Sequence, residues 1–171
     1  MNVDLKKLVI SDLSPFYTWL ADNDVIKYSL SIFQNLNSKT AINTWFTKLI
    51  ETNDELVLGI FLQNTSELIG YAGICCLNKE RNIGEYFIFI GNKDYWGKGV
   101  STEVTKRIVE LGFSQLKLHK IILTVFEDNI GGQKSYKRVG FKETGILKNA
   151  RLIDNKMQNK IIMSLEKSIS V

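Results

Sequence analysis

The stretch DYWGKGVSTE, residues 94–103, holds two glycines and a lysine directly ahead of a segment with helical spacing. The first backbone N–H groups of a helix have no partner within the helix, and they form a natural site for an anion. Glycine allows a ligand to approach the backbone closely. We therefore expect this stretch to bind an anion, and the surrounding sequence indicates which one.

The patterns on either side of this stretch predict a mixed α/β fold. We expect a helix from Ser14 as N-cap, with Pro15 at its first position, and a second helix over 38–51. Gly140 should end a short helix within 128–141. The other expected elements are strands at 3–10, 56–63, 67–77, 84–91 and 119–126, a helix over 100–116, and a final hairpin of 143–153 and 156–167 turning at 154–155.

These elements add up to an α/β (α+β) fold with one domain over residues 1–171. We expect a mixed central sheet of about six to seven strands, flanked by about four helices. The 171 residues are enough for a single substantial core, and no repeat or low-complexity linker divides them.

The composition narrows the class of protein. The 22 Lys and Arg against 18 Asp and Glu leave a net charge of +4, too weak to indicate a nucleic-acid partner. No apolar run approaches about 18 residues and no basic-plus-apolar leader is visible, so we expect a cytoplasmic protein with no membrane association. Adjacent Cys75 and Cys76 are expected to be buried and reduced, and the single histidine, His119, argues against a metal site.

Two nucleotide-binding motifs do not fit the glycine stretch. A P-loop has four residues between its first Gly and the Gly-Lys pair, whereas Gly91 and Gly97 enclose five, and Gly99 follows Lys98 in place of a hydroxyl residue. A dinucleotide fingerprint requires a third glycine, where this chain has Thr102.

The loop WGKGVST followed by an amphipathic helix resembles the pyrophosphate loop of the GNAT superfamily of acyl-CoA-dependent N-acyltransferases. The family pattern is Gln/Arg-x-x-Gly-x-Gly/Ala, and this chain departs from it at both ends, with Trp96 first and Ser101 last. The resemblance is to the branch of the ribosomal-protein N-terminal acetyltransferases and the spermidine acetyltransferases. It implies that backbone amides surround the diphosphate of acetyl-CoA, and the cofactor-binding residues are then Gly97, Lys98, Gly99, Val100, Ser101 and Thr102.

Two further stretches carry the same resemblance, which spans about residues 65–165. FEDNIGGQKSYKRVGF (126–141) matches the second family signature through Asn129, Tyr136, Gly140 and Phe141. Gly132 stands where the family often has Ser or Ala. GEYFIFIG (84–91) resembles the fourth strand, whose backbone pairs with pantetheine and, near Phe89 or Ile90, polarises the thioester carbonyl.

The resemblance implies an acetyl-CoA-dependent N-acetyltransferase in which a primary amine attacks the thioester directly. An alkylamine with a pKa of about 10.4 must lose a proton first, and Glu85 is the candidate base because this branch often has an acidic residue there. Tyr136 is the candidate acid for the departing thiolate. An acyl-cysteine intermediate is not favoured, because no histidine or lysine adjoins Cys75 or Cys76.

The acceptor site should come from the first 50 residues and the final hairpin, with Asp24, Tyr28 and Phe33 as candidate lining. The sequence leaves a peptide N-terminus, a polyamine, an aminoglycoside and an amino sugar open as acceptors. A homodimer is expected from the resemblance alone. The alternative function is a catalytically silent acyl-CoA-binding sensor or interaction module, and a weaker one is a nucleoside-triphosphate binder.

Overall fold

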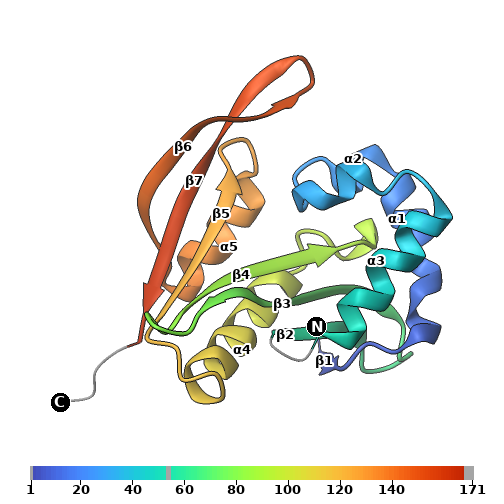
Figure 1. Ribbon diagram of the computed structural model, residues 1–171, viewed down its shortest axis with the longest axis horizontal. Helices are drawn as coiled ribbons and strands as arrows, with labels where there is room; N and C mark the ends of the chain where they lie inside the picture. The colour runs from blue at the N-terminus through green and yellow to red at the C-terminus, as the bar shows by residue number, and fades with distance from the viewer. Residues whose placement is uncertain (1, 53–54, 168–171) are drawn as a thin grey trace. The chain divides into compact units, whose positions relative to one another are not determined.

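The computed structural model describes residues 2–52 and 55–167. Within these residues it holds a seven-stranded mixed sheet with the order β1-β2-β3-β4-β5-β7-β6 (Figure 1). The strands are β1 (Val3–Lys6), β2 (Leu56–Leu62), β3 (Leu68–Asn78), β4 (Ile83–Ile90), β5 (Lys120–Phe126), β6 (Lys142–Ile153) and β7 (Lys156–Glu166). The predicted fold class and strand number are confirmed.

Five α-helices and three short 3₁₀ turns accompany these strands in the described part of the chain. The helices are α1 (Ser14–Ala21), α2 (Asn23–Ile26), α3 (Lys39–Glu51), α4 (Val100–Ser114) and α5 (Ile130–Val139). The 3₁₀ turns are η1 (Ile10–Leu13), η2 (Ser31–Asn35) and η3 (Lys93–Tyr95). Of the helices formed by residues 2–52 and 55–167, none combines the length and apolar character needed to cross a bilayer.

The chain forms two compact units. The first unit contains the residues up to Gly73 together with Ile88–Val100, and the second contains Ile74–Phe87 and the residues from Ser101 on. Strands β3 and β4 contribute residues to both units.

An aromatic cluster forms the core of the first unit. The Phe16 ring on α1 is fully buried, and its centroid lies 5.0–5.6 Å from the ring centroids of Trp19, Trp45, Phe46 and Tyr71. Edge-to-face contacts of this kind add to the free energy that burial of the rings already contributes. Truncating one buried Phe to Ala costs about 3–5 kcal/mol, so this cluster makes a large contribution to the stability of the first unit.

The N-terminal helices begin as their sequence patterns indicate, with one exception. Ser38 caps α3, because its side-chain oxygen accepts a hydrogen bond of 3.1 Å from the Ala41 N–H. The prediction of Ser14 as an N-cap is wrong: Ser14 is the first residue of α1, and Leu13 precedes it in helical conformation. The 3₁₀ turn η1 leads directly into α1. The first strand, predicted over 3–10, ends at Lys6, and Ile10 is already the first residue of η1.

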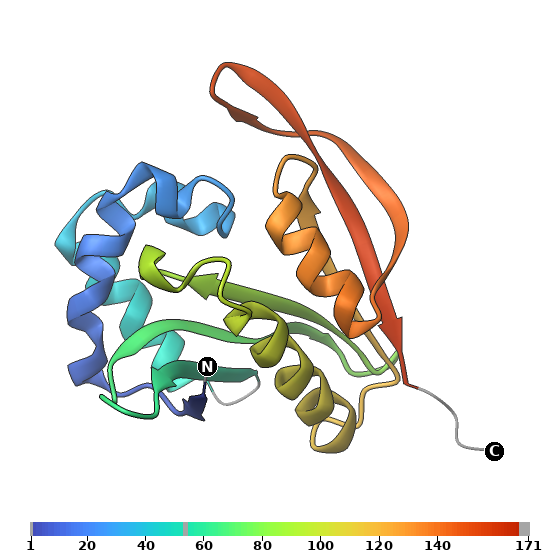
Figure 2. The ribbon, with the colours of Figure 1, turned by 180° about the vertical axis from the view of Figure 1, so that it is seen from behind.

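The second unit contains the crossover expected between parallel strands. Strands β4 and β5 pair in parallel, with Ile83 opposite Lys120 and Glu85 opposite Ile122. Such a pair requires a long connection, which α4 supplies. Helix α4 buries Val104 and other apolar side chains of the same face, and Figure 2 shows α4 and α5 both in front of the strands of this unit.

The predicted final hairpin is confirmed. Strands β6 and β7 pair antiparallel from Lys142 opposite Ser164 to Ile153 opposite Lys156. Both turn residues are left-handed, with φ of 50° at Asp154 and 59° at Asn155, as in the tight turn that suits twisted hairpins.

The two cysteines are more exposed to solvent than the sequence suggested. Cys75 is half-buried and Cys76 is exposed, so the prediction of buried thiols is wrong, although both are free of disulfides. Cys76 has a φ of 52°, a left-handed conformation that interrupts the alternation of the strand. The apolar run 67–77 is fully buried only over its first part, Leu68–Ile74.

Two glycines of α5 provide a matched test of helix termination. Gly140 caps α5 with a φ of 110°, and Gly131 lies inside the helix with open space around an added Cβ. We expect Gly140→Ala to lower the free energy of unfolding by about 1–2 kcal/mol, the cost of a left-handed alanine. Gly131→Ala should raise it by about 0.5–1 kcal/mol. Urea unfolding of both variants measures this difference, and equal effects of the two substitutions would contradict it.

Candidate active site

The glycine loop is built by backbone conformation. Gly97 has a φ of 71° and Gly99 a φ of 83°, and α4 starts directly afterwards at Val100. A Cβ added to either glycine would meet nothing within 4 Å. Glycine is therefore required here for the left-handed conformation, and the space beside the backbone is open.

The first turn of α4 is anchored by one buried side chain and two hydroxyl groups. Val100 is 2% exposed. The Thr102 Oγ1 lies 3.0 Å from the Ser135 Oγ, which also donates a hydrogen bond of 3.1 Å to the Ser101 Oγ. The Thr102 hydroxyl is thus engaged with Ser135, whereas the Ser101 hydroxyl accepts from Ser135 and keeps its own O–H as a donor beside the backbone N–H groups. Ser135 was not among the predicted site residues. The sequence feature that marks it is a small polar residue on the buried face of the short helix α5.

A second hydroxyl chain fixes the same turn from the strand side. The Tyr86 hydroxyl lies 2.9 Å from the Thr105 Oγ1, and the Thr105 hydroxyl donates to the Ser101 carbonyl at 2.6 Å. Tyr86 and Thr105 are both buried, so these bonds satisfy polar groups that would otherwise be costly to bury. Burial raises the pKa of Tyr86 well above its usual value, and the nearby Tyr136 raises it further.

Tyr136, the candidate acid, lies on α5 and is 8% exposed. Its ring centroid is 6.0 Å from that of Tyr86 and 6.2 Å from that of Phe141. Burial raises the pKa of Tyr136 to about 12, because the phenolate would lose its hydration in this aromatic surrounding. The phenol is therefore fully protonated at neutral pH.

Asn129 caps α5 in the structure. Its side-chain Oδ1 accepts a hydrogen bond of 3.0 Å from the Gly132 N–H. A Cβ on residue 132 would lie 2.9 Å from the Asn129 Nδ2. Glycine at this position is therefore explained by the close approach of the Asn129 side chain, whose Nδ2 group is the part that can still donate to a ligand.

Glu85, the candidate base, is half-buried in β4 opposite Ile122 of β5. Its charge acts on Lys160 of β7. The pKa of Lys160 is lowered mainly by burial, then by the charge of Arg151, and is raised by Glu85. The carboxylate of Glu85 therefore belongs to a charged cluster that the sequence analysis did not identify.

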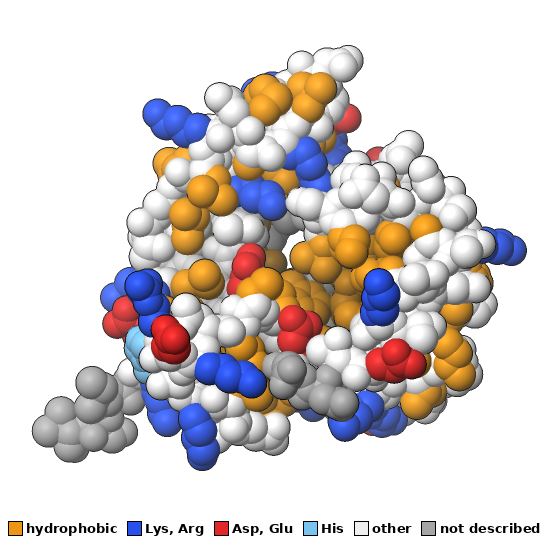
Figure 3. Space-filling model, viewed as in Figure 1, with side chains coloured by type: hydrophobic (Ala, Val, Ile, Leu, Met, Phe, Trp, Pro, Cys, Tyr) orange, Lys and Arg blue, Asp and Glu red, His pale blue; other side chains and the backbone are white. Residues whose placement is uncertain are grey.

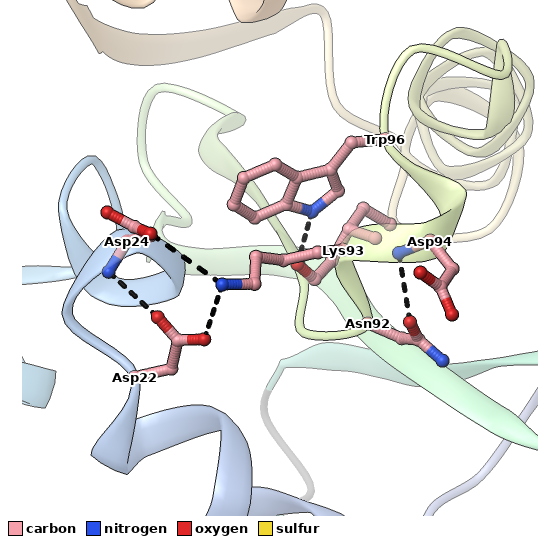
Figure 4. A network of polar contacts seen from close by, with 7 residues as sticks. Asp22, Asp24, Asn92, Lys93, Asp94 and Trp96 are labelled. Atoms are coloured by element: carbon pink, nitrogen blue, oxygen red, sulfur yellow. Dashed lines mark hydrogen bonds and ion pairs between the residues drawn. The ribbon is translucent and has the colours of Figure 1, made fainter.

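The end of β4 makes a side-chain contact that the sequence did not predict (Figure 4). The Trp96 Nε1 donates a hydrogen bond of 2.9 Å to the Ile90 carbonyl, and the indole remains 44% exposed. Phe89 is buried, with its side chain in the aromatic cluster of the first unit. Lys98 lies over the Tyr95 ring at 5.6 Å from its centroid. The sequence feature that corresponds to this contact is a tryptophan, whose indole N–H is a donor, six residues after the last residue of β4.

Asp24, the acidic residue proposed for the acceptor site, shares a lysine with its neighbour Asp22. The Lys93 Nζ lies 2.6 Å from the Asp22 Oδ2 and 3.6 Å from the Asp24 Oδ2, as Figure 4 shows. The hydrogen bond from Lys93 lowers the pKa of Asp22, and the same bond raises the pKa of Lys93. The carboxylates are thus partly neutralised by a cation of the chain itself.

The other two proposed acceptor residues differ in exposure. Tyr28 is half-buried, with the Lys27 Nζ 5.5 Å from its ring centroid. Phe33 is only 2% exposed, and its ring centroid lies 4.9 Å from that of Phe89 and 5.2 Å from that of Trp45. Phe33 thus belongs to the aromatic core of the first unit.

The candidate residues fall in both units. Those of the second unit are Glu85, Ser101, Thr102, Asn129 and Tyr136; those of the first unit are Asp24, Tyr28, Phe33, Phe89, Ile90, Gly97, Lys98, Gly99 and Val100. No group of three or more His, Cys, Asp or Glu side chains able to hold a metal ion occurs in the part of the chain that the structure describes.

The chain is similar to known proteins over most of its length. The acetyltransferase (GNAT) domain matches residues 2–142. The uncharacterized N-acetyltransferase p20 of Bacillus licheniformis is 24% identical over 159 residues, which are 90% of this chain and 89% of that protein. The spermidine N(1)-acetyltransferase of Vibrio cholerae is 27% identical over 144 residues, 76% of this chain and 83% of that protein.

A solved structure agrees with these relatives. The crystal structure of spermidine N-acetyltransferase from Vibrio cholerae in complex with CoA and spermine superposes with a TM-score of 0.84 at 23% identity, covering 96% of this chain and 95% of that one. The chain belongs to the GNAT acetyltransferase family. The predicted class, an acetyl-CoA-dependent N-acetyltransferase, is confirmed at the level of this family.

The buried Tyr136 predicts a specific dependence of stability on pH. Because its folded pKa is raised from about 10 to about 12, its contribution is complete below pH 10 and is lost as the pH rises toward 12. We expect the difference in unfolding free energy between the wild type and Tyr136→Phe to fall by up to about 1.4 kcal/mol per pH unit above pH 10. Urea unfolding between pH 8 and about 11.5 measures it. A difference that stays constant over this range would contradict the burial of an ionisable phenol.

Proposed function

We propose that residues 1–171 act as one acetyltransferase domain that transfers an acetyl group from acetyl-CoA to a primary amine by direct attack. The family match supports a single domain because residues 2–142 include parts of both compact units. The amine nitrogen forms a bond to the thioester carbon, the carbon–sulfur bond breaks, and the thiolate receives a proton.

One observation carries this proposal: the loop Gly97–Thr102, with two left-handed glycines, open space at both Cβ positions and a helix that begins at Val100. Successive N–H groups in such a turn, followed by a helix N-terminus, bind phosphate groups well. The Thr102 hydroxyl is bonded to Ser135, so we assign recognition of the diphosphate to the backbone N–H groups, with the O–H of Ser101 as an additional donor. The Lys98 ammonium and the Asn129 Nδ2 are further donors that we assign to acetyl-CoA.

For the end of β4 we propose a more limited role than the sequence suggested. The Ile90 carbonyl accepts the Trp96 indole, so it is engaged before any pantetheine could pair with it. We therefore assign binding of pantetheine and the thioester carbonyl to the remaining backbone groups of Phe89 and Ile90. The Trp96 contact would hold this strand end in place beside the glycine loop.

Glu85 is the proposed base, acting directly or through water. Its half-buried carboxylate on a central strand suits the removal of a proton from an ammonium group. The cysteines do not offer a better route, because Cys75 and Cys76 lie in the part of β3 where the strand leaves the core.

Tyr136 is the proposed acid, and its raised pKa limits what it can do. A phenol with a pKa of about 12 is a weaker acid than a thiol with a pKa of about 8.5, so complete transfer of its proton to the thiolate is uphill. We propose that the phenol stabilises the developing thiolate mainly by a hydrogen bond, a preorganised form of electrostatic stabilisation.

For the acceptor site we retain Asp24 and Tyr28 as proposed contacts, with Phe33 supporting them from the core of the first unit. Spermidine is the substrate in the name of the Vibrio cholerae relative. The ion pairs of Lys93 with Asp22 and Asp24 argue that these carboxylates are not simply available to a cationic amine.

One set of variants separates catalysis from cofactor binding. We expect Gly99→Val to weaken CoA binding at least tenfold by straining the loop, whereas Glu85→Gln and Tyr136→Phe should bind CoA normally and lose about 100-fold in turnover. Calorimetry with CoA and thiol release with a panel of amines are the measurements. Glu110→Gln, an exposed carboxylate change on α4, is the matched control and should behave like the wild type.

The same experiment distinguishes the rival function. Tight CoA binding without thiol release for any amine, and with no effect of Glu85→Gln or Tyr136→Phe, would establish a silent acyl-CoA sensor in place of an enzyme. Failure of the folded wild type to bind CoA would remove both functions.

We further propose a cytoplasmic homodimer. Cys75 and Cys76 of β3 form no disulfide, which suits a reducing compartment. The β6–β7 hairpin exposes four large hydrophobic side chains, those of Ile146, Leu147, Leu152 and Met157. Figure 3 shows hydrophobic side chains, in orange, on the surface of this hairpin. A second copy could cover this face with its own, as a twofold interface does. Light scattering should give twice the monomer mass and Leu152→Glu should shift it to the monomer; a monomeric wild type would refute the dimer.

A further inference from the structure

Two positive charges lie over one aromatic ring in the second unit. The guanidinium carbon of Arg151 is 4.4 Å from the ring centroid of Phe126, and the Lys160 Nζ is 4.7 Å from the same centroid. Lys160 of β7 is directly opposite Phe126 of β5 in the strand register, whereas Arg151 comes from β6. Two strands thus direct cations to the last residue of a third.

The two cations are unfavourable neighbours for each other. Both side chains are half-buried, and burial lowers the pKa of each, while the charge of Arg151 lowers that of Lys160 further. Contact with the ring face compensates in part. An anion placed beside the pair would relieve both the desolvation and the repulsion.

The acidic residues that follow Phe126 are bonded to neutral donors. The Asn159 Nδ2 donates to Glu127 at 2.9 Å, and the Gln158 Nε2 donates to Asp128 at 2.7 Å. Among residues 2–52 and 55–167, Lys160 makes no ion pair with a carboxylate. The carboxylates next to the ring are thus bonded to side-chain amides and form no ion pair with Lys160. The carboxylate whose charge acts on Lys160 is that of Glu85.

The cation pair is also close to the proposed base. Glu85 is opposite Ile122 on β5, four residues before Phe126, and its charge acts on Lys160. Four strand residues correspond to about 13 Å along β5, a separation that the lysine and glutamate side chains reduce. When the amine of an acceptor lies at Glu85, a second group of the same molecule, joined to the amine by a short spacer, lies near the two cations.

We propose that Arg151 and Lys160 form an anion-binding subsite for the acceptor, which is therefore an amine that carries a carboxylate or phosphate group a short spacer away. This inference rests on the proposed function and on Glu85 as its base. It predicts an acceptor unlike the polyamine named in the spermidine-acetylating relatives, because Arg151 and Lys160 repel a further ammonium group.

Matched acceptors that differ only in the anionic group test the subsite. Glycylglycine is compared with glycylglycinamide, and 2-aminoethyl phosphate with ethanolamine, with spermidine as the polycation. Thiol release from acetyl-CoA gives kcat/KM, and calorimetry on CoA-saturated protein gives acceptor binding without turnover. We expect the anionic member of at least one pair to be preferred about tenfold or more, the scale of a charge-assisted contact.

Charge variants locate the preference. Lys160→Gln and Arg151→Gln should each reduce this preference about tenfold, because kcat/KM should fall more for glycylglycine and 2-aminoethyl phosphate than for glycylglycinamide and ethanolamine, while Lys160→Arg should retain the preference. Lys156→Gln is the matched control, because Lys156 is an exposed lysine on the same strand. CoA affinity should be the same in all four variants.

The outcomes are distinct from failure of the enzyme itself. If no acceptor is acetylated but glycylglycine or 2-aminoethyl phosphate still binds in a Lys160-dependent way, the subsite stands and the proposed activity is wrong. Preference for the neutral or polycationic acceptors overturns the subsite. So does an equal loss for every acceptor in Lys160→Gln, because this would reveal a purely structural role.

Discussion

The start of α4 is the constraint on which the rest of the second unit depends. Val100 is buried, and the hydroxyl or carbonyl groups of the next two residues are bonded to Ser135 on α5 and to Thr105, which in turn contacts Tyr86 on β4. Hydrogen bonds in such a buried network polarise one another and fix one arrangement. The first turn of α4 is therefore bonded to α5 through Ser135 and to β4 through Thr105 and Tyr86, while the space beside Gly97 and Gly99 stays open.

The same network connects the proposed diphosphate site to the proposed acid. Ser135 bonds the first turn of α4, and the next residue, Tyr136, sits in an aromatic surrounding that raises its pKa to about 12. Position and protonation state of the phenol are thus set by the packing of α5 against the start of α4.

Charge is distributed differently in the two units. In the first unit Asp22 and Asp24 share one lysine, Lys93, and in the second unit Arg151 and Lys160 share one aromatic ring. Asp22 and Asp24 form ion pairs with Lys93, whereas Lys160 forms no ion pair with a carboxylate among the described residues. This difference favours an acceptor with an anionic group.

Local patterns in the sequence were enough to predict most helices and strands, the Gly140 cap, the 154–155 turn and the family, because periodicity and turn chemistry act within a few residues. Burial at Cys75 and Cys76, the first residue of α1, the Trp96 bond to Ile90 and the cations over Phe126 were decided only by tertiary structure. Arg151 and Phe126 are far apart in the chain and meet because β7 lies between β5 and β6. Strand order and register bring such residues together, and no local pattern encodes them.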